Sequence, residues 1–249
     1  MKSIKKGFQY LYTVYAFAIF IVLMLMVLLP IILVSATLKH PEKAVSNILH
    51  FWAASWFMLI GIKQKGLNNP YHTSNRPTIF IANHISYLDI PAIILAIQHT
   101  PAKILGKAEL GKLPVFGWIY KIAVVSVDRL SAKSKALSLQ ELKDILSRNV
   151  SVVIFPEGGF NESEEVLKDF YNGAFTLSKE LNIPIAPVLL LSTYRRLNQQ
   201  SLFSISAGES LVEYMPLVYP NSFNTAADMK QYSFGVMKES LTKYRASNC

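Results

Sequence analysis

The chain opens with two long stretches in which apolar residues follow one another without a charge. Residues 7–38 contain no charged side chain, and their centre, 16–34, is almost entirely Ile, Leu, Val, Met, Phe and Ala. About 20 apolar residues span a bilayer as a helix, so this stretch predicts a membrane helix, with Pro30 expected to kink it. A signal peptide is disfavoured because its apolar region is only about 7–15 residues long.

A second uncharged stretch, residues 44–62, predicts a helix that returns the chain to its starting side. Residues 1–65 are therefore predicted to form a membrane anchor of two hydrophobic helices. Lysines lie at both ends of this anchor, with Lys2, Lys5 and Lys6 before the first uncharged stretch and Lys63 and Lys65 after the second. Because positive charges favour the cytoplasmic side, the rest of the chain is predicted on the cytoplasmic face of the cell membrane. Helices that lie shallowly in one leaflet agree equally well with this pattern.

Residues 66–249 change to short apolar runs that alternate with amphipathic stretches, which is typical of an α/β domain. Strands are predicted at 78–82, 123–127, 150–155, 185–191, 203–207 and 212–217, and helices at 88–97, 132–148, 166–181 and 226–244. The predicted fold is a mixed, mostly parallel sheet flanked by helices. Residues 104–120 are apolar but broken by glycines and a proline. They predict a loop that borders an apolar ligand or dips into the membrane, unless they belong to the domain core.

Composition and charge support a membrane location. Of the 249 residues, 51% are hydrophobic and only 16% charged, below the roughly 25% charge of soluble domains. The net charge is +9, and the first 66 residues hold seven Lys and one Glu. This excess points to anionic lipid headgroups, and no base-reading motif supports nucleic acid. The single Cys, Cys249, excludes an internal disulfide and Cys-based metal sites, and we expect it to be inert.

The strongest chemical signal directly follows the first predicted strand of the domain. It reads Asn83-His84-Ile85-Ser86-Tyr87-Leu88-Asp89. In α/β domains, sites gather at the carboxyl ends of strands. His84 suits a general base near neutral pH, and Asp89 is close enough along the chain to orient its ring. By spacing alone, a helix cap beside a surface histidine is the alternative.

Two further motifs follow predicted strands. Phe155-Pro156-Glu157-Gly158-Gly159 comes after residues 150–155, and its glycines permit a close backbone approach, although an ordinary turn explains it as well. Arg129, which follows Asp128 after residues 123–127, suits bidentate binding of a phosphate, with a surface Asp–Arg pair as the alternative.

Taken in order, these blocks resemble the glycerolipid acyltransferase family, specifically the bacterial 1-acylglycerol-3-phosphate O-acyltransferases. The likeness extends over most of residues 64–220. The family's N-H-x4-D block is matched by Asn83, His84 and Asp89. Its other blocks are matched by Lys107, Glu109, Pro114 and Gly117 leading to Asp128 and Arg129, by Phe155 to Gly158, by Phe170 to Phe175, and by Ile183 to Val188.

The resemblance implies that His84 is the general base on a lysolipid hydroxyl that attacks the thioester of acyl-CoA or acyl carrier protein. Asp89 would orient His84 and stabilise its charge, and Arg129, helped by Lys107, would hold the acceptor phosphate. Glu157 and Gly158 would shape the acceptor site. The implied product is phosphatidic acid, made at the membrane without a metal or other cofactor.

The chain departs from the family at one place. The family's third block usually continues E-G-T-R-S, but here Gly159, Phe160 and Asn161 follow Gly158. Loss of the Arg removes a phosphate ligand, which leaves room for another acceptor such as an amino-acid-containing lysolipid. Two further alternatives are a membrane-anchored metal-dependent hydrolase that uses His84, Asp89 and Glu157, and a non-enzymatic lipid-binding module. Neither an H-E-x-x-H helix nor a G-x-S-x-G elbow is present in the sequence.

Overall fold

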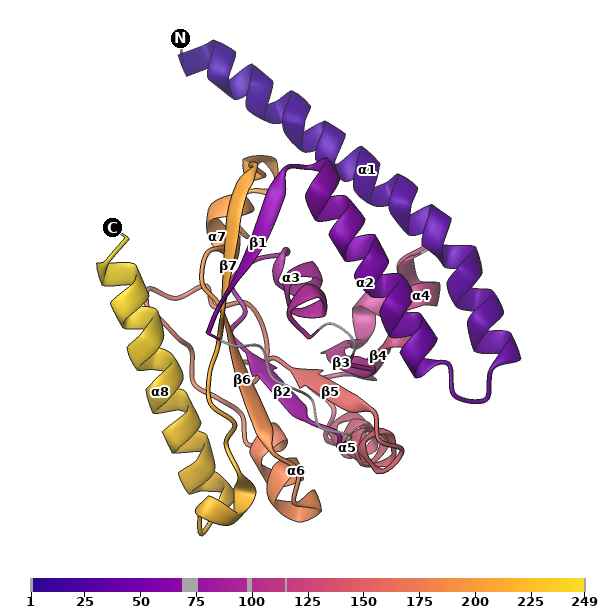
Figure 1. Ribbon diagram of the computed structural model, residues 1–249, viewed down its shortest axis with the longest axis vertical. Helices are drawn as coiled ribbons and strands as arrows, with labels where there is room; N and C mark the ends of the chain where they lie inside the picture. The colour runs from indigo at the N-terminus through magenta and orange to yellow at the C-terminus, as the bar shows by residue number, and fades with distance from the viewer. Residues whose placement is uncertain (1, 69–75, 98–99, 115, 249) are drawn as a thin grey trace.

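In the computed structural model, residues 2–68, 76–97, 100–114 and 116–248 are described, with side chains from Gly7 onwards. Cys249 lies outside the described residues. Among the described residues, seven strands form one sheet in the order β1-β7-β6-β2-β5-β3-β4 (Figure 1). All neighbours are parallel except β6 and β7. The strands are β1 (Ile62–Leu67), β2 (Ile79–Ala82), β3 (Ala102–Lys107), β4 (Val124–Val127), β5 (Ser151–Ile154), β6 (Ile185–Leu190) and β7 (Gly208–Tyr214).

Helices cover both faces of this sheet. One face packs against α1 (Lys2–Thr37), α2 (Glu42–Leu59), α3 (Asp89–Ala96) and α4 (Phe116–Ala123). The other face packs against α5 (Ala132–Ser147), α6 (Gly173–Leu181) and α8 (Ala226–Ala246). Short helical turns complete the described chain: η1 (Ala108–Lys112), α7 (Thr193–Arg196), η2 (Leu202–Ser204) and η3 (Pro220–Ser222). The predicted mixed, mostly parallel α/β fold is confirmed.

The central strand β2 illustrates why the apolar runs form buried strands. Its side chains alternate between two hydrophobic cores, with Phe80 and Ala82 in one and Ile79 and Ile81 in the other. A strand covered on both faces needs an apolar residue at every position, so it reads as a continuous apolar run. β5 and β6 are fully buried in the same way. These three strands place the chemical motifs at one edge of the sheet.

Several predicted elements differ from the structure. Residues 203–207 are not a strand, since η2 covers part of them and β7 begins at Gly208. The predicted helix at 166–181 begins only at Gly173, because the N–H groups of Lys168 and Tyr171 are donated to Glu157 and to the carbonyl of Pro156. β1 and β3 were not predicted, and β1 is an edge strand whose sequence carries three polar residues. The stretch 104–120 contains most of β3, η1 and the start of α4.

The two N-terminal helices pack closely together. Residues Gly7–Thr37 of α1 are long and apolar enough to cross a membrane, and no other helix among the described residues meets this criterion. The predicted second helix ends at Leu59 and not at residue 62. Gly61 has a φ of +61°, and β1 begins at Ile62. Residues 62–65, which were predicted to belong to the anchor segment 1–65, therefore form part of the sheet.

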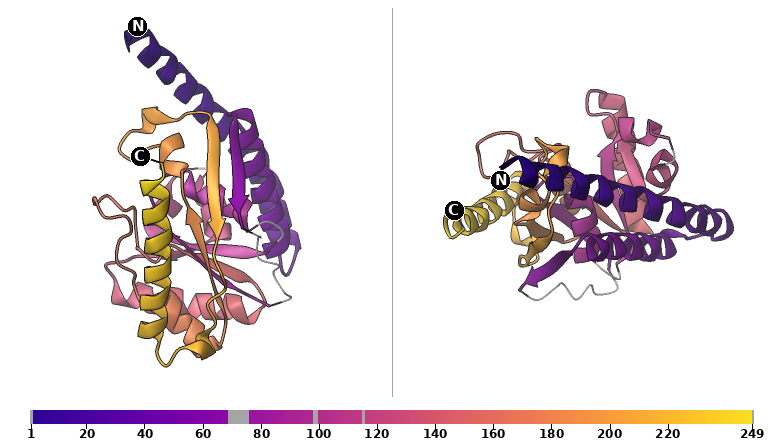
Figure 2. Two further views of the ribbon diagram at one scale, coloured as in Figure 1. Left: turned by 60° about the vertical axis from the view of Figure 1, so that its left-hand side comes forward. Right: turned by 90° about the horizontal axis from the view of Figure 1, so that it is seen from above.

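α2 packs against both α1 and the domain (Figure 2). The indole Nε1 of Trp56 donates a 2.9 Å hydrogen bond to the carbonyl of Ala16, and the hydroxyl of Tyr15 donates to the carbonyl of Leu59 at 3.0 Å. These bonds join the first half of α1 to the C-terminal turn of α2. A two-helix anchor remains a prediction, as does the choice between a spanning and a monotopic arrangement.

Candidate active site

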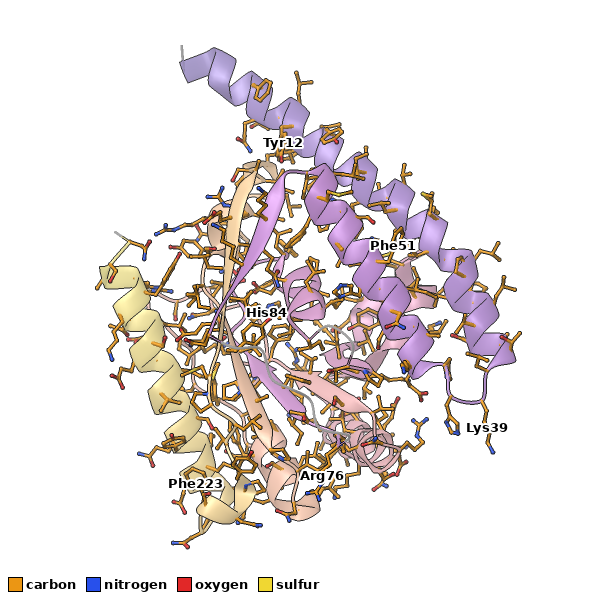
Figure 3. All side chains as sticks on the ribbon, viewed as in Figure 1. Tyr12, Lys39, Phe51, Arg76, His84 and Phe223 are labelled. Atoms are coloured by element: carbon orange, nitrogen blue, oxygen red, sulfur yellow. The ribbon has the colours of Figure 1, made fainter. Side chains whose placement is uncertain are left out.

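His84 lies just beyond the carboxyl end of β2, near the centre of the molecule (Figure 3). Its Nδ1 is 2.9 Å from Oδ2 of Asp89, in the first turn of α3. A carboxylate at Nδ1 fixes the tautomer in which Nε2 carries the lone pair, which is the form a general base needs. The His84 side chain is 15% exposed and Asp89 is fully buried, so the pair is not a surface histidine beside a helix cap.

Asp89 accepts hydrogen bonds from several directions. Besides His84, its Oδ2 accepts the backbone N–H groups of Ile85 at 2.6 Å and Ser86 at 2.8 Å. Its Oδ1 accepts the hydroxyl of Thr193 at 2.6 Å, from the turn that follows β6. These hydrogen bonds restrict the rotation of the carboxyl group. Asp89 is therefore held in one orientation beside the imidazole.

Glu157 is also fully buried, and its two oxygens point to backbone groups. Oε1 accepts the N–H of His84 at 2.7 Å, and Oε2 accepts the N–H of Lys168 at 2.9 Å. Glu157 thus ties the end of β5 to the residue that carries the imidazole. This geometry favours a positioning role for Glu157 over direct contact with an acceptor.

Burial raises the pKa of Glu157 to about 7, although the two backbone hydrogen bonds oppose this effect. A carboxyl whose pKa is raised on folding binds its proton more tightly in the folded chain. Its contribution to stability is therefore complete below about pH 4.5 and is lost as pH rises through about 7.

In Glu157→Gln, this pH-dependent contribution is absent. We therefore compare the free energy of unfolding of the parent with that of the variant as pH rises from 4.5 to 7. The parent value should fall by about 3 kcal/mol relative to the variant, since each pKa unit corresponds to about 1.36 kcal/mol. Chemical unfolding of both proteins in the same detergent across this range measures the difference. Parallel stability curves would contradict the raised pKa.

Gly158 and Gly159 form the turn after β5, and Arg129 lies against Gly159. Gly158 has a φ of +71°, and a Cβ on it would lie 2.4 Å from the ring of Tyr171, so this position requires glycine. A Cβ on Gly159 would lie 3.4 Å from Nη1 of Arg129, which places the guanidinium against the glycine turn. Asp128 accepts the N–H of Leu130, and within the described ranges no ion pair joins Asp128 to Arg129. The guanidinium is thus available to an anionic ligand at this edge.

Lys107 lies at the end of β3, where it is paired in register with Val127 of β4. Arg129 comes two residues after Val127 in the chain, so this pairing places Lys107 near the start of the segment that carries Arg129. Its Nζ is 3.4 Å from a carboxylate oxygen of Glu109, and both side chains are more than half exposed. Such an exposed pair contributes little to stability and leaves Lys107 able to turn toward an anion. His84, Glu157, Lys107 and Arg129 thus follow four adjacent parallel strands at one edge of the sheet.

A family model described as Acyltransferase matches residues 62–191, more than half of the chain. The chain belongs to the acyltransferase family. A 1-acyl-sn-glycerol-3-phosphate acyltransferase of Chlamydomonas reinhardtii is 27% identical over 174 residues, 68% of this chain and 50% of that protein. A lyso-ornithine lipid O-acyltransferase of Pseudomonas aeruginosa is 32% identical over 122 residues, 49% of this chain and 45% of that protein. The chain thus spans about half the length of these two relatives.

The crystal structure of the LPA acyltransferase PlsC from Thermotoga maritima has a TM-score of 0.79 with this chain. The match covers 99% of this chain and 98% of that one at 19% sequence identity, so the likeness is one of fold. It includes the α1–α2 pair as well as the sheet. The predicted membership of the acyltransferase family is confirmed.

The sequence reasoning missed Thr193 and the contact of the Phe160 ring with His84 in this acyltransferase site. Thr193 follows a predicted strand, but only the β6–β2 adjacency shows that its hydroxyl reaches Asp89. Phe160 stands where the family usually has Arg, and its ring centroid is 4.2 Å from that of His84. It also makes an edge contact with Tyr87 at 4.9 Å. An apolar ring therefore borders the imidazole at the position of the missing cation.

The alternative of a metal-dependent hydrolase requires a set of side chains placed to hold a metal ion. In the part of the chain that the structure describes, no three His, Cys, Asp or Glu side chains are placed to hold a metal ion. Glu157 in particular turns its oxygens to the N–H groups of His84 and Lys168. His84, Asp89 and Glu157 are therefore arranged for hydrogen bonding.

Proposed function

We propose that this protein is a membrane-bound 1-acylglycerol-3-phosphate O-acyltransferase. It transfers a fatty acyl group from acyl-CoA or acyl carrier protein to the free hydroxyl of the lysolipid and forms phosphatidic acid for phospholipid biosynthesis. The proposal rests chiefly on the 2.9 Å contact between His84 and the buried Asp89, at the sheet edge that also carries Arg129. The names of the relatives support the same acceptor.

In this mechanism, Nε2 of His84 takes the proton of the acceptor hydroxyl as its oxygen attacks the thioester carbonyl. The tetrahedral intermediate then collapses, the carbon–sulfur bond breaks, and the thiol leaves with the proton from the imidazolium. Asp89 stabilises the imidazolium during this cycle because its charge lies against Nδ1. General-base assistance of this kind typically contributes about 10²–10⁴-fold, and placement of the two substrates adds to it.

The location of the substrates fits a membrane-anchored domain. The lysolipid resides in the bilayer, whereas the thioester carrier is water-soluble and arrives from the cytoplasm. α1 supplies a helix that is long enough to hold the domain at the membrane. We propose that the site faces the cytoplasmic leaflet, and that the reaction uses no metal or resident cofactor.

A panel of acceptors tests this function. Purified protein is given lysophosphatidic acid, lyso-ornithine lipid and other lysolipids, each with acyl-CoA or with acyl carrier protein, and the products are identified by mass. Formation of phosphatidic acid from lysophosphatidic acid at the highest kcat/KM is the expected result. No acylation of lysophosphatidic acid with either donor would overturn the proposal.

A second candidate function is O-acylation of an amino-acid-containing lysolipid. It is favoured by Phe160, whose ring contacts His84 and Tyr87 where the family usually supplies an Arg. A lyso-ornithine lipid O-acyltransferase also stands among the relatives. An acceptor without a phosphate needs fewer cations, and the same panel separates the two functions by the preferred acceptor.

Arg129→Ala is expected to raise the KM for a phosphorylated acceptor by about 10-fold or more with little change in kcat. A charge-assisted hydrogen bond contributes about 1.5–3 kcal/mol, and its loss weakens ground-state and transition-state binding alike. Initial rates against acceptor concentration measure this effect. Lys133→Ala, which removes an exposed positive charge on α5, is the matched control. An unchanged KM would place the phosphate elsewhere.

A further inference from the structure

Three large apolar side chains stand exposed on the packed pair of η1 and α4. Trp118 is 64% exposed, and Leu110 and Leu113 are each more than 40% exposed. We name these three residues the η1–α4 patch. The lysines Lys112 and Lys121 are exposed on the same two elements. Clustered exposed apolar residues usually mark an interaction surface, and Trp and Leu mixed with Lys are typical of segments that lie at a membrane interface.

The position of the patch relates it to the candidate active site. η1 begins directly after Lys107, at the carboxyl end of β3, which is the edge of the sheet that carries His84 and Arg129. Leu130, which follows Arg129 at this edge, is 97% exposed. Exposed apolar side chains therefore lie at the same end of the sheet as His84 and Arg129.

One element of the patch, α4, also contacts the apolar N-terminal helix. α4 packs against α1 and α2, beside which it lies in Figure 1. Along α1, a row of large apolar side chains is exposed: Ile21, Val22, Leu25, Met26, Leu29 and Leu33. A bilayer that takes up this helix lies next to η1 and α4. Lys112 and Lys121 match the negative charge of an anionic leaflet, where each such residue contributes about 1 kcal/mol.

We propose that the η1–α4 patch is a second membrane contact, in which Leu110, Leu113 and Trp118 enter the headgroup boundary of an anionic leaflet. This contact holds the carboxyl edge of the sheet at the lipid surface. A lysolipid then passes from the leaflet to His84 without crossing water. Only this last consequence rests on the proposed function, since the membrane contact itself requires no catalysis.

Labels on single cysteines test the contact. In a Cys249→Ser background, a nitroxide is attached to Leu113→Cys, to Trp118→Cys or to Leu137→Cys, and the full chain is placed in vesicles of phosphatidylcholine and phosphatidylglycerol. Leu137 is the matched control, since it is a 62% exposed leucine on α5, which covers the other face of the sheet. Labels at 113 and 118 should be several-fold more accessible to oxygen than to a water-soluble nickel complex, and the label at 137 should show the reverse.

Two results would overturn the proposal. Equal access of the nickel complex to positions 118 and 137 would mean that the patch faces water. Protection of position 118 from both reagents, with dipolar broadening between labels, would mean that a second copy of the chain covers it. Neither readout depends on activity, so a failed acceptor assay leaves the labelling result intact.

A kinetic comparison gives an independent measure. Trp118→Ala should raise the apparent KM several-fold for a lysolipid embedded in vesicles and leave the rate in detergent micelles unchanged, whereas Leu137→Ala should change neither. Equal KM values for Trp118→Ala and the parent in vesicles would count against the contact. Absence of activity in both proteins would instead contradict the proposed function.

Discussion

His84→Ala is expected to lower turnover by about 10²–10⁴-fold or more, the largest loss of any single substitution in this chain. Without the imidazole, no group at the end of β2 takes the proton from the acceptor hydroxyl, and the attacking oxygen stays protonated. The release of free thiol from acyl-CoA, followed with a thiol reagent, measures the rate. The KM for either substrate should change little, because His84 acts in the transition state.

His40→Ala is the matched control, since His40 is exposed in the turn between α1 and α2. It should keep the parent rate. Thermal unfolding of both variants distinguishes lost chemistry from lost structure. A rate for His84→Ala within a few-fold of the parent would remove the general base from the mechanism. A parent activity that a chelator abolishes would instead revive the metal-dependent alternative.

Asp89→Asn is expected to lower kcat by about 10²-fold or more with an unchanged KM. The introduced amide carries no charge, so it neither stabilises the imidazolium nor enforces the tautomer that leaves Nε2 unprotonated. A lower kcat with an unchanged KM distinguishes a role of Asp89 in orienting His84 from a role in substrate binding, which would raise KM. Steady-state rates with saturating donor and varied acceptor provide the measurement.

The fold should tolerate this substitution. The amide oxygen can accept the N–H groups that Asp89 Oδ2 now accepts, while its NH₂ group faces the hydroxyl of Thr193, which is able to reverse from donor to acceptor. We therefore expect a fall in melting temperature of only a few degrees. Asp144→Asn, at an exposed position on α5, serves as the control and should be neutral. An Asp89→Asn protein with full turnover would remove Asp89 from the mechanism.

Much of the fold follows from the apolar pattern. β2, β5 and β6 are buried on both faces, so their uninterrupted apolar runs identify them at sequence level. β1 could not be predicted in this way, because an edge strand needs no continuous apolar run and its sequence IKQKGL contains none. Residues 203–207 show the opposite error, since their apolar residues pack beside α1 through contacts such as that of Phe203 with Tyr10.

The His84–Asp89 pair was predictable because it is local. Five residues separate the two side chains, and the turn that leads into α3 brings them together without help from distant segments. For Glu157, the part in shaping an acceptor site that the family resemblance implies stays a prediction. What the motif left open is the direction of its oxygens, which accept the N–H groups of His84 and Lys168. A motif does not reveal which way a buried carboxylate turns.

Local sequence thus specified the long apolar N-terminal helix, the strands of the sheet centre and the His84–Asp89 contact, because each depends on residues within one or two turns or on one apolar run. The order in which strands pair decided the rest. Placing β2 between β5 and β6 brings Glu157 to the backbone of His84 and Thr193 to Asp89, across separations of 73 and 104 residues. Such contacts arise only when the sheet closes, since no local periodicity records which strands will be neighbours.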